Sequence, residues 1–107
     1  MKIIITGKKI TFFLSTDIEI KDKAIKEKEK QSIVDAVKKH IKYGFRCFVF
    51  DCNKLRNKPA SFVINTFVEC LRLVKKFDGR IILYNLRQEY RELLEIMQLD
   101  SLFTFDD

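Results

Sequence analysis

The chain has 107 residues, 47% hydrophobic and 12% aromatic, which is enough apolar material for one core and too much for a disordered chain. Only three glycines and one proline exclude a collagen-like or low-complexity chain. Twenty-one lysines and arginines against 15 acidic residues give a net charge of +6, which first suggests a small nucleic-acid-binding protein. We expect a single domain spanning residues 1–107.

The excess positive charge lies in the first half of the chain. Residues 1–50 contain twelve basic and six acidic residues, whereas residues 51–107 contain nine of each. In the basic stretches 21–30 and 38–42, acidic or apolar residues dilute the lysines. Nucleic-acid sites usually place arginine and aromatic side chains among their lysines, and no arginine precedes Arg46. A solvated, lysine-rich helical face is therefore the favoured interpretation of the charge.

The chain begins with a pattern that is typical of a β-hairpin. Residues 2–6 and 10–14 are short runs rich in β-branched and aromatic residues, with a Gly-Lys-Lys turn between them. Residues 15–20 are expected to continue as extended chain or loop. The N-terminal apolar run is too short for a signal peptide, and no stretch approaches the roughly 18 apolar residues of a membrane span.

The first predicted helix spans residues 27–43 and ends before Gly44, as helices commonly do. Its apolar residues recur at helical spacing; they are Ile33, Val34, Val37 and Ile41. His40, the single histidine, lies in the last turn. We expect it on the surface, where a cation favours the helix dipole.

The middle of the chain predicts a strand followed by a second helix. Residues 46–51 contain the run Cys-Phe-Val-Phe, apolar at successive positions, which predicts a central parallel strand covered on both faces. A polar loop follows over residues 51–58. Pro59 is then suited to be the first residue of a helix that runs to about Phe77.

The last third of the chain repeats this alternation. Residues 80–84 predict a second buried strand, and Asn85 with Gln88 is expected to cap the next helix. Residues 102–105 predict a last short strand. The element order ββαβαβαβ, with right-handed crossovers, predicts an α/β fold: a mixed, mostly parallel sheet with an N-terminal hairpin and helices packed on it.

No catalytic or metal-binding motif is present in the sequence. The three cysteines form no CxxC pair and favour a reducing cytoplasm, with Cys47 and Cys70 buried and Cys52 in a loop. His40 belongs to no zinc-binding pattern, and no glycine-rich loop is available for a nucleotide. Asp51 ends a predicted strand, where α/β folds place functional carboxylates, but holding the following loop is its favoured role. We expect no enzyme activity, no metal and no cofactor.

Four segments of the chain carry a resemblance to a known family. Residues 14–20 (Leu-Ser-Thr-Asp-Ile-Glu-Ile) are similar to that family's Leu-Ser-Gly-Glu-Leu-Asp-Ile, and residues 49–55 to its Val-Leu-Asp-Leu-Ser-x-Val. Residues 77–83 are similar to Gly-Gly-x-Leu-x-Leu, and residues 94–103 to Leu-x-x-x-Gly-Leu-x-x-Leu-Phe. In this order and spacing, the segments resemble STAS domains, the fold of anti-anti-sigma factors (anti-sigma factor antagonists). The resemblance covers nearly the whole chain.

The resemblance implies a regulatory site at the start of the helix after the central strand. The family pattern there is Asp-Ser-Ser-Gly-Leu-Gly, whose first serine is phosphorylated in many members; residues 59–64 (Pro-Ala-Ser-Phe-Val-Ile) align with it. Ala60 stands at the usual phosphoacceptor position, so the motif is degenerate and Ser61 is the remaining candidate. A helix start tolerates a phosphate. The alternative is that Ser61 only caps its own helix turn.

The resemblance also implies a partner-binding face built from three segments. Its expected residues are Ser15, Thr16, Asp17, Glu19, Asp51, Asn53, Lys54, Arg56, Asn57, Lys58, Pro59, Ala60, Ser61 and Phe62. Among them, Phe62 is expected to be exposed and to anchor the interface. The implied partner is an anti-sigma factor or a serine-kinase-like ATPase domain. The protein is expected to be cytoplasmic, not inserted in a membrane, and monomeric when free.

Three other functions stay open on the sequence. A STAS-like chain without a phospho-switch can be a subunit of a larger transport or sensory complex, which the degenerate motif favours. A small basic nucleic-acid-binding module is less favoured, because it rests on net charge alone. An enzyme that uses Asp51 and Ser61 ranks last.

Overall fold

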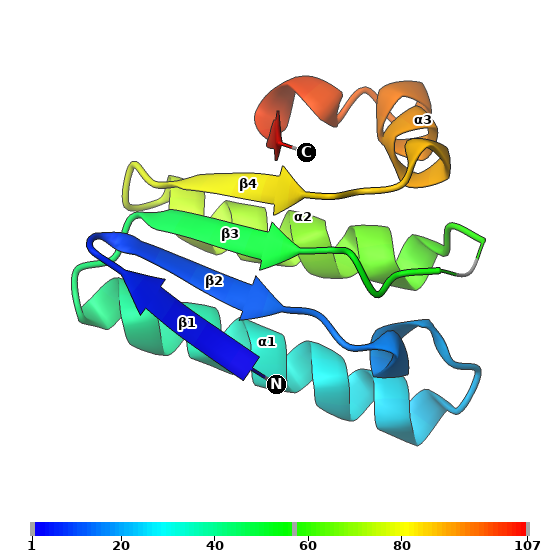
Figure 1. Cartoon of the computed structure of the whole chain (residues 1–107), viewed down its shortest axis with the longest axis horizontal. Helices are drawn as coiled ribbons and strands as arrows, with labels where there is room; N and C mark the ends of the chain where they lie inside the picture. The colour runs from blue at the N-terminus through cyan, green and yellow to red at the C-terminus, as the bar shows by residue number, and fades with distance from the viewer. Residues whose placement is uncertain (1, 57, 107) are drawn as a thin grey trace.

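A computed structural model describes residues 2–56 and 58–106 as a five-stranded sheet whose strands follow chain order (Figure 1). The strands are β1 (Lys2–Thr6), β2 (Lys9–Phe13), β3 (Cys47–Asp51), β4 (Arg80–Tyr84) and β5 (Thr104–Asp106). β1 pairs antiparallel with β2, and all later neighbours pair in parallel. The predicted mixed sheet with an N-terminal hairpin is therefore confirmed.

Three α-helices connect the described strands. They are α1 (Lys23–Lys42), α2 (Ser61–Lys75) and α3 (Gln88–Ile96), and two 3-10 helices, η1 (Thr16–Glu19) and η2 (Asp100–Leu102), join them. α1 and α2 lie side by side against one face of the sheet, whereas α3 lies at the side of the sheet that β4 and β5 form (Figure 1). The element order ββαβαβαβ is confirmed. No helix of the described residues is long and apolar enough to cross a membrane.

The hydrophobic core lies between the sheet and helices α1 and α2. Alternate strand residues point into it; they are Ile10, Phe12, Phe48, Phe50, Ile81 and Leu83, all fully buried. A row of aromatic rings crosses the centre, with centroid distances of 5.7 Å from Phe12 to Phe50 and 5.8 Å from Phe50 to Phe67. This packing fixes where each strand ends and so positions the loops.

The other face of the sheet lines a shallow surface hollow. Thr11, Val49 and Ile82 are register neighbours on β2, β3 and β4, and all three line this hollow. The successive apolar residues Phe48, Val49 and Phe50 are all buried, as predicted, but the face that carries Val49 lines a surface hollow. Val49 is only 8% exposed although it faces the hollow, since neighbouring side chains on adjacent strands shield it.

Helix α1 begins four residues earlier than predicted. Asp22 caps it, because one carboxylate oxygen accepts hydrogen bonds from the backbone N–H groups of Ala24 (3.0 Å) and Ile25 (3.2 Å). The first turn is rich in lysine and has no apolar stripe, so hydrophobic periodicity cannot detect it. The cap is the signal that locates it.

The prediction that His40 lies on the surface is wrong. Its side chain is buried, and Nδ1 donates a 2.7 Å hydrogen bond to the carbonyl oxygen of Ala36. The ring packs edge-on against Phe12, Tyr43 and Phe45, with centroids about 6 Å apart. An imidazole satisfied by the preceding helical turn can be buried among aromatic rings at low cost.

The starts of α2 and α3 also differ from the prediction. The carbonyl of Ala60 accepts the first helical hydrogen bonds of α2, so this helix begins at Ser61 and Pro59 lies outside it. Asn85 does not cap α3. It adopts a left-handed conformation (φ 56°) and donates its N–H to the carbonyl of Asp106, while Arg87 takes the cap position.

Candidate protein-binding surface

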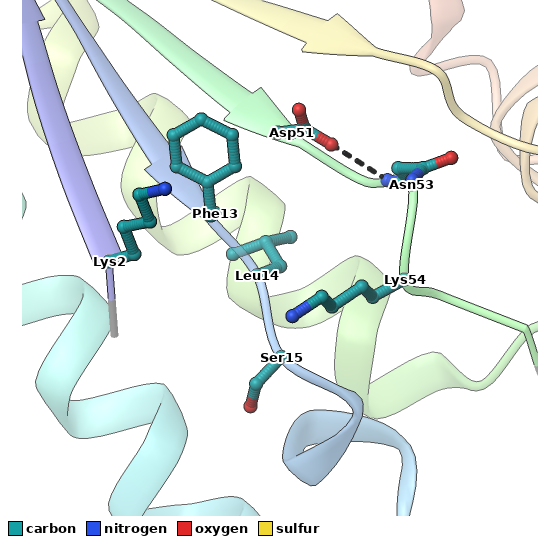
Figure 2. A pocket seen from close by; sticks show the side chains of 7 residues that line it. All are labelled: Lys2, Phe13, Leu14, Ser15, Asp51, Asn53 and Lys54. Carbon is teal, nitrogen blue, oxygen red and sulfur yellow. Dashed lines mark hydrogen bonds between the residues drawn. The ribbon is translucent and has the colours of Figure 1, made fainter.

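A shallow hollow of about 320 Å³ lies at the carboxyl ends of β2 and β3 (Figure 2). It is lined by Lys2, Phe13, Leu14, Ser15, Asp51, Asn53 and Lys54. Four of these, namely Ser15, Asp51, Asn53 and Lys54, belong to the partner-binding face expected from the sequence. Parallel pairing of β2 with β3 sets Phe13 opposite Asp51 and so brings the two distant segments together.

Asp51 holds the turn that forms one wall of this hollow. Its carboxylate accepts a 3.0 Å hydrogen bond from the N–H of Asn53, drawn as the dashed line in Figure 2. Its backbone carbonyl accepts from the N–H of Leu14 at 3.1 Å, which fixes the opposite wall. The side chain and the backbone of Asp51 therefore both shape the hollow.

The segment from Ser15 to Glu19 forms the 3-10 helix η1 and its cap. The hydroxyl of Ser15 accepts a 3.2 Å hydrogen bond from the N–H of Asp17. Thr16 and Asp17 are exposed, whereas Ile18 is buried and anchors the turn in the core. The predicted loop is thus a short helical turn that presents two polar side chains beside the hollow.

The loop between β3 and α2 is held in place by Glu19. One carboxylate oxygen of Glu19 accepts the N–H of Arg56 at 2.9 Å, and the other accepts the hydroxyl of Tyr90 at 2.6 Å. From the other side, the guanidinium of Arg87 donates to the backbone carbonyl of Arg56 and forms a 2.7 Å ion pair with Glu89. Elements η1 and α3 together determine the position of this loop.

The sequence did not indicate Tyr90 and Arg87 as parts of the surface. Tyr90 lies in an apolar stripe of α3 with Leu93 and Leu94, and it is fully buried. A tyrosine among leucines is a usable signal, because a buried hydroxyl needs a hydrogen-bond partner. Burial first, and then the hydrogen bond to Glu19, raise the pKa of Tyr90, so the phenol stays protonated and keeps donating.

The three cysteines differ from their expected burial in two places. Cys52 lies in the loop as expected but is completely buried, and its thiol donates to the carbonyl of Phe50. Cys47, expected to be buried, is only half-buried. Cys70 is buried as expected. Burial is the main cause that raises the pKa of Cys52, and it raises that of Cys70 to about 12, so both are protonated thiols.

The first turn of α2 presents Ser61 to solvent. Ala60 is the cap residue and makes no side-chain cap hydrogen bond. The expectation that Phe62 is exposed is wrong: it is half-buried, and the ammonium groups of Lys26 and Lys30 from α1 lie 5.0 Å and 5.5 Å from its ring centre. The first turn of α2 therefore presents the hydroxyl of Ser61 to solvent and the ring of Phe62 to two lysines of α1.

Cations flank the start of α2. Lys54, Arg56 and Lys58 are all exposed, and Pro59 is half-buried. Asn57, also expected on the partner-binding face, lies outside the described residues. Within residues 2–56 and 58–106, no three His, Cys, Asp or Glu side chains gather as a metal site would require. The surface offers hydroxyl, amide and ammonium groups, which suit an acidic or polar protein segment.

Solved structures with this fold include anti-sigma factor antagonists. A crystal structure described as a candidate anti-sigma factor antagonist (TM1081) of Thermotoga maritima superposes with a TM-score of 0.74 at 14% identity, covering 99% of this chain and 85% of the other. The anti-sigma factor antagonist SpoIIAA in its unphosphorylated form superposes with a TM-score of 0.69 at 15% identity, covering 97% and 85%. This chain has the anti-sigma factor antagonist fold.

An NMR structure of TM1081 gives a TM-score of 0.73 at 14% identity, covering 98% of this chain and 78% of the other. By sequence, the chain matches no family model and no curated protein. The STAS resemblance drawn from four short segments is therefore confirmed at the level of the fold.

Proposed function

We propose that this domain is a cytoplasmic bacterial regulator that binds a protein partner, an anti-sigma factor or a serine-kinase-like ATPase domain. The observation that carries the proposal is the hollow in Figure 2, which Ser15, Asp51, Asn53 and Lys54 line together at the start of the loop that leads from β3 to α2. The shared fold with anti-sigma factor antagonists supports the same role. The free protein is proposed to be a monomer.

The proposed regulator differs from its family in the phospho-switch. Ala60 occupies the position of the usual phosphoacceptor and has no hydroxyl to modify. Ser61 is exposed one residue later, with Lys54 and Lys58 in the preceding loop. We favour binding that is constitutive or controlled from the partner's side, with Ser61 unphosphorylated.

The partner can be sought by affinity capture from an extract of the source organism. Immobilised protein should retain an anti-sigma factor or a kinase-like ATPase, identified by mass spectrometry and then titrated as a purified protein. Lys54→Glu should weaken that binding by about tenfold or more, whereas Lys28→Glu, an exposed site on α1, should not. Retention of transport or sensory-complex subunits alone would favour the alternative assembly role.

The state of Ser61 is tested separately. The protein is incubated with the identified kinase-like partner and ATP, and its intact mass is measured. We expect no gain of a phosphoryl group. A gain in mass that disappears in Ser61→Ala would overturn the proposal that Ser61 is unphosphorylated, while leaving the proposal of partner binding intact.

A further inference from the structure

The positive charge of the molecule gathers at the end opposite the hollow of Figure 2. We define the basic pole as residues 7–9, 38–47 and 72–80: the β1–β2 turn and the last turns of α1 and α2 with their connections to β3 and β4. The three connections lie together at the left end of Figure 1. The pole holds ten basic residues and one acidic residue, a net charge of +9, whereas the rest holds eleven basic and fourteen acidic residues, −3.

The cations of the basic pole face solvent. All ten are exposed; they are Lys8, Lys9, Lys38, Lys39, Lys42, Arg46, Arg72, Lys75, Lys76 and Arg80. The salt bridges found among the described residues, Lys30 to Glu69 and Arg87 to Glu89, both lie outside the pole. Favourable interaction with helix dipoles explains lysines in the last turns of α1 and α2, but not Lys8 and Lys9 in the hairpin.

Two exposed aromatic rings lie among these cations. Tyr43 is 67% exposed, with the ammonium of Lys39 6.0 Å from its ring centre; Phe77 is 48% exposed, with the guanidinium of Arg46 5.5 Å away. Arg46 is held in this position because its guanidinium donates to the carbonyl oxygen of Ile41, in the last turn of α1, and to that of Phe45, in the connection to β3. The fold thus supplies the arginine and aromatic residues that the lysine stretches lack in sequence.

Three shallow hollows lie on the pole. The first lies between α1 and α2; its lining residues are Lys38, Ile41, Lys42, Leu73, Lys76 and Phe77. The Arg46–Phe77 contact joins it to a second hollow of about 480 Å³, which Lys8 and Gly44 share with a third beside Tyr43. Each of the three hollows is lined by at least one lysine or arginine, so a flexible polyanion that crosses the pole could meet cations at each.

We propose that the basic pole binds single-stranded nucleic acid, with the lysines and arginines on phosphates and the rings of Tyr43 and Phe77 available for base stacking. This site is separate from the proposed partner surface. A duplex fits less well, because α1 and α2 meet the pole with their carboxyl ends and project no helix into a groove. A membrane fits less well, because membrane binding needs a broad apolar face, and the pole exposes these two rings among ten cations.

The proposal is tested by fluorescence anisotropy with labelled RNA and DNA strands of about 20 nucleotides. We expect binding at low salt that weakens about a hundredfold between about 50 mM and about 200 mM salt, as several phosphate contacts require. The RNA and DNA arms show which sugar is preferred. Absence of binding to both strands at low salt would overturn the proposal.

Two pairs of charge-reversal substitutions test whether binding depends on the charge of the basic pole or on the total charge of the protein. Lys42→Glu with Lys76→Glu should weaken binding by about tenfold or more, whereas Lys23→Glu with Lys28→Glu, at exposed sites near the other end of α1, should have little effect. Tyr43→Ala should weaken binding about tenfold through lost stacking. Equal weakening by the two charge pairs overturns the proposal.

Two competing ligands complete the test. Vesicles containing phosphatidylglycerol that bind the protein while the nucleic-acid strands do not would assign the pole to a membrane surface and overturn the proposal. Poly-glutamate that competes as well as the strands do would also overturn it, since a polypeptide has no bases to stack. Failure of partner capture at the opposite end leaves every one of these outcomes unchanged.

Discussion

The two ends of the sheet are built in different ways. At the carboxyl end, long loops are held by side chains from distant elements, such as Glu19 to Arg56 and Tyr90 to Glu19. At the basic pole, tight connections are closed by their own backbone, such as Phe45 N–H to the carbonyl of His40 and Gly79 N–H to that of Val74, both 3.0 Å. One end depends on a few side chains, the other on backbone geometry.

This difference determines what substitutions do. At the carboxyl end, removing one buried polar group releases a loop and changes the shape of the proposed partner surface. At the basic pole, surface lysines can be exchanged without altering the connections beneath them, so charge and shape vary independently. The exception at the basic pole is a glycine whose neighbours leave no space for a side chain.

Gly79 is that position, and we expect Gly79→Ala to give the largest effect. An added Cβ would lie 2.5 Å from Cγ1 of Val74 and 2.7 Å from the carbonyl oxygen of Arg46. We predict a loss of about 3 kcal/mol in the free energy of unfolding, measured in urea. Gly7→Ala is the control: it has open space but φ +61°, so it should cost about 1 kcal/mol. Equal losses would contradict the account.

Tyr90→Phe tests the carboxyl end. The change removes the hydroxyl that donates to Glu19, so we predict a loss of about 1.5 kcal/mol and faster hydrogen exchange at the Arg56 amide. Tyr43→Phe at the basic pole removes an exposed hydroxyl and should change stability by less than about 0.5 kcal/mol. If the Arg56 amide exchanges at an unchanged rate, Glu19 does not hold the loop in the way described.

Hydrophobic patterns predicted the elements because burial requires them. The strand residues that enter the core, such as Phe48 and Phe50, are the same residues whose apolar run predicted β3. The segments compared with the family motifs also fall where the fold needs them. Asp78 and Gln98 stand where those motifs have glycine, and both have φ 59°, the left-handed backbone that glycine adopts most easily.

What the sequence missed depends on contacts between distant residues. Glu19 and Tyr90 are 71 positions apart, and nothing local marks them as partners. The charge of the basic pole escaped a count by halves, because four of its ten cations, Arg72, Lys75, Lys76 and Arg80, come from the half with no net charge. These residues lie near the basic stretch 38–42 only in the folded protein, because the sheet places the β1–β2 turn and the connections from α1 to β3 and from α2 to β4 at one end.

The rates at which the cysteine thiols are alkylated compare the two ends of the sheet. Cys47 lines a hollow of the basic pole, whereas Cys52 lies in the loop at the carboxyl end with its side chain fully buried. With iodoacetamide at pH 8, Cys47 should be alkylated first, and Cys52 and Cys70 more than about tenfold more slowly, since burial raises their pKa. Peptide mapping by mass spectrometry gives the order. Early alkylation of Cys52 would show that its loop opens readily.

The same pKa shifts predict a pH dependence of stability. Above about pH 9 the unfolded chain loses protons that the folded Cys70 keeps until its pKa of about 12. The free energy of unfolding should therefore fall as pH rises from about 9 toward 12, and be independent of this thiol at lower pH. Cys70→Ala should flatten that alkaline decline, measured by urea unfolding at each pH.

The smallest expected effect comes from Asp78, the one acidic residue of the basic pole. Asp78→Gly removes both a left-handed non-glycine residue and a negative charge, so we predict a gain of about 0.5 kcal/mol and nucleic-acid binding about threefold tighter. Gln98→Gly is the matched control, because its φ is the same 59° but it carries no charge. It should gain similar stability and leave binding unchanged. Tighter binding in both variants would mean that backbone rigidity, and not the charge of the pole, controls affinity.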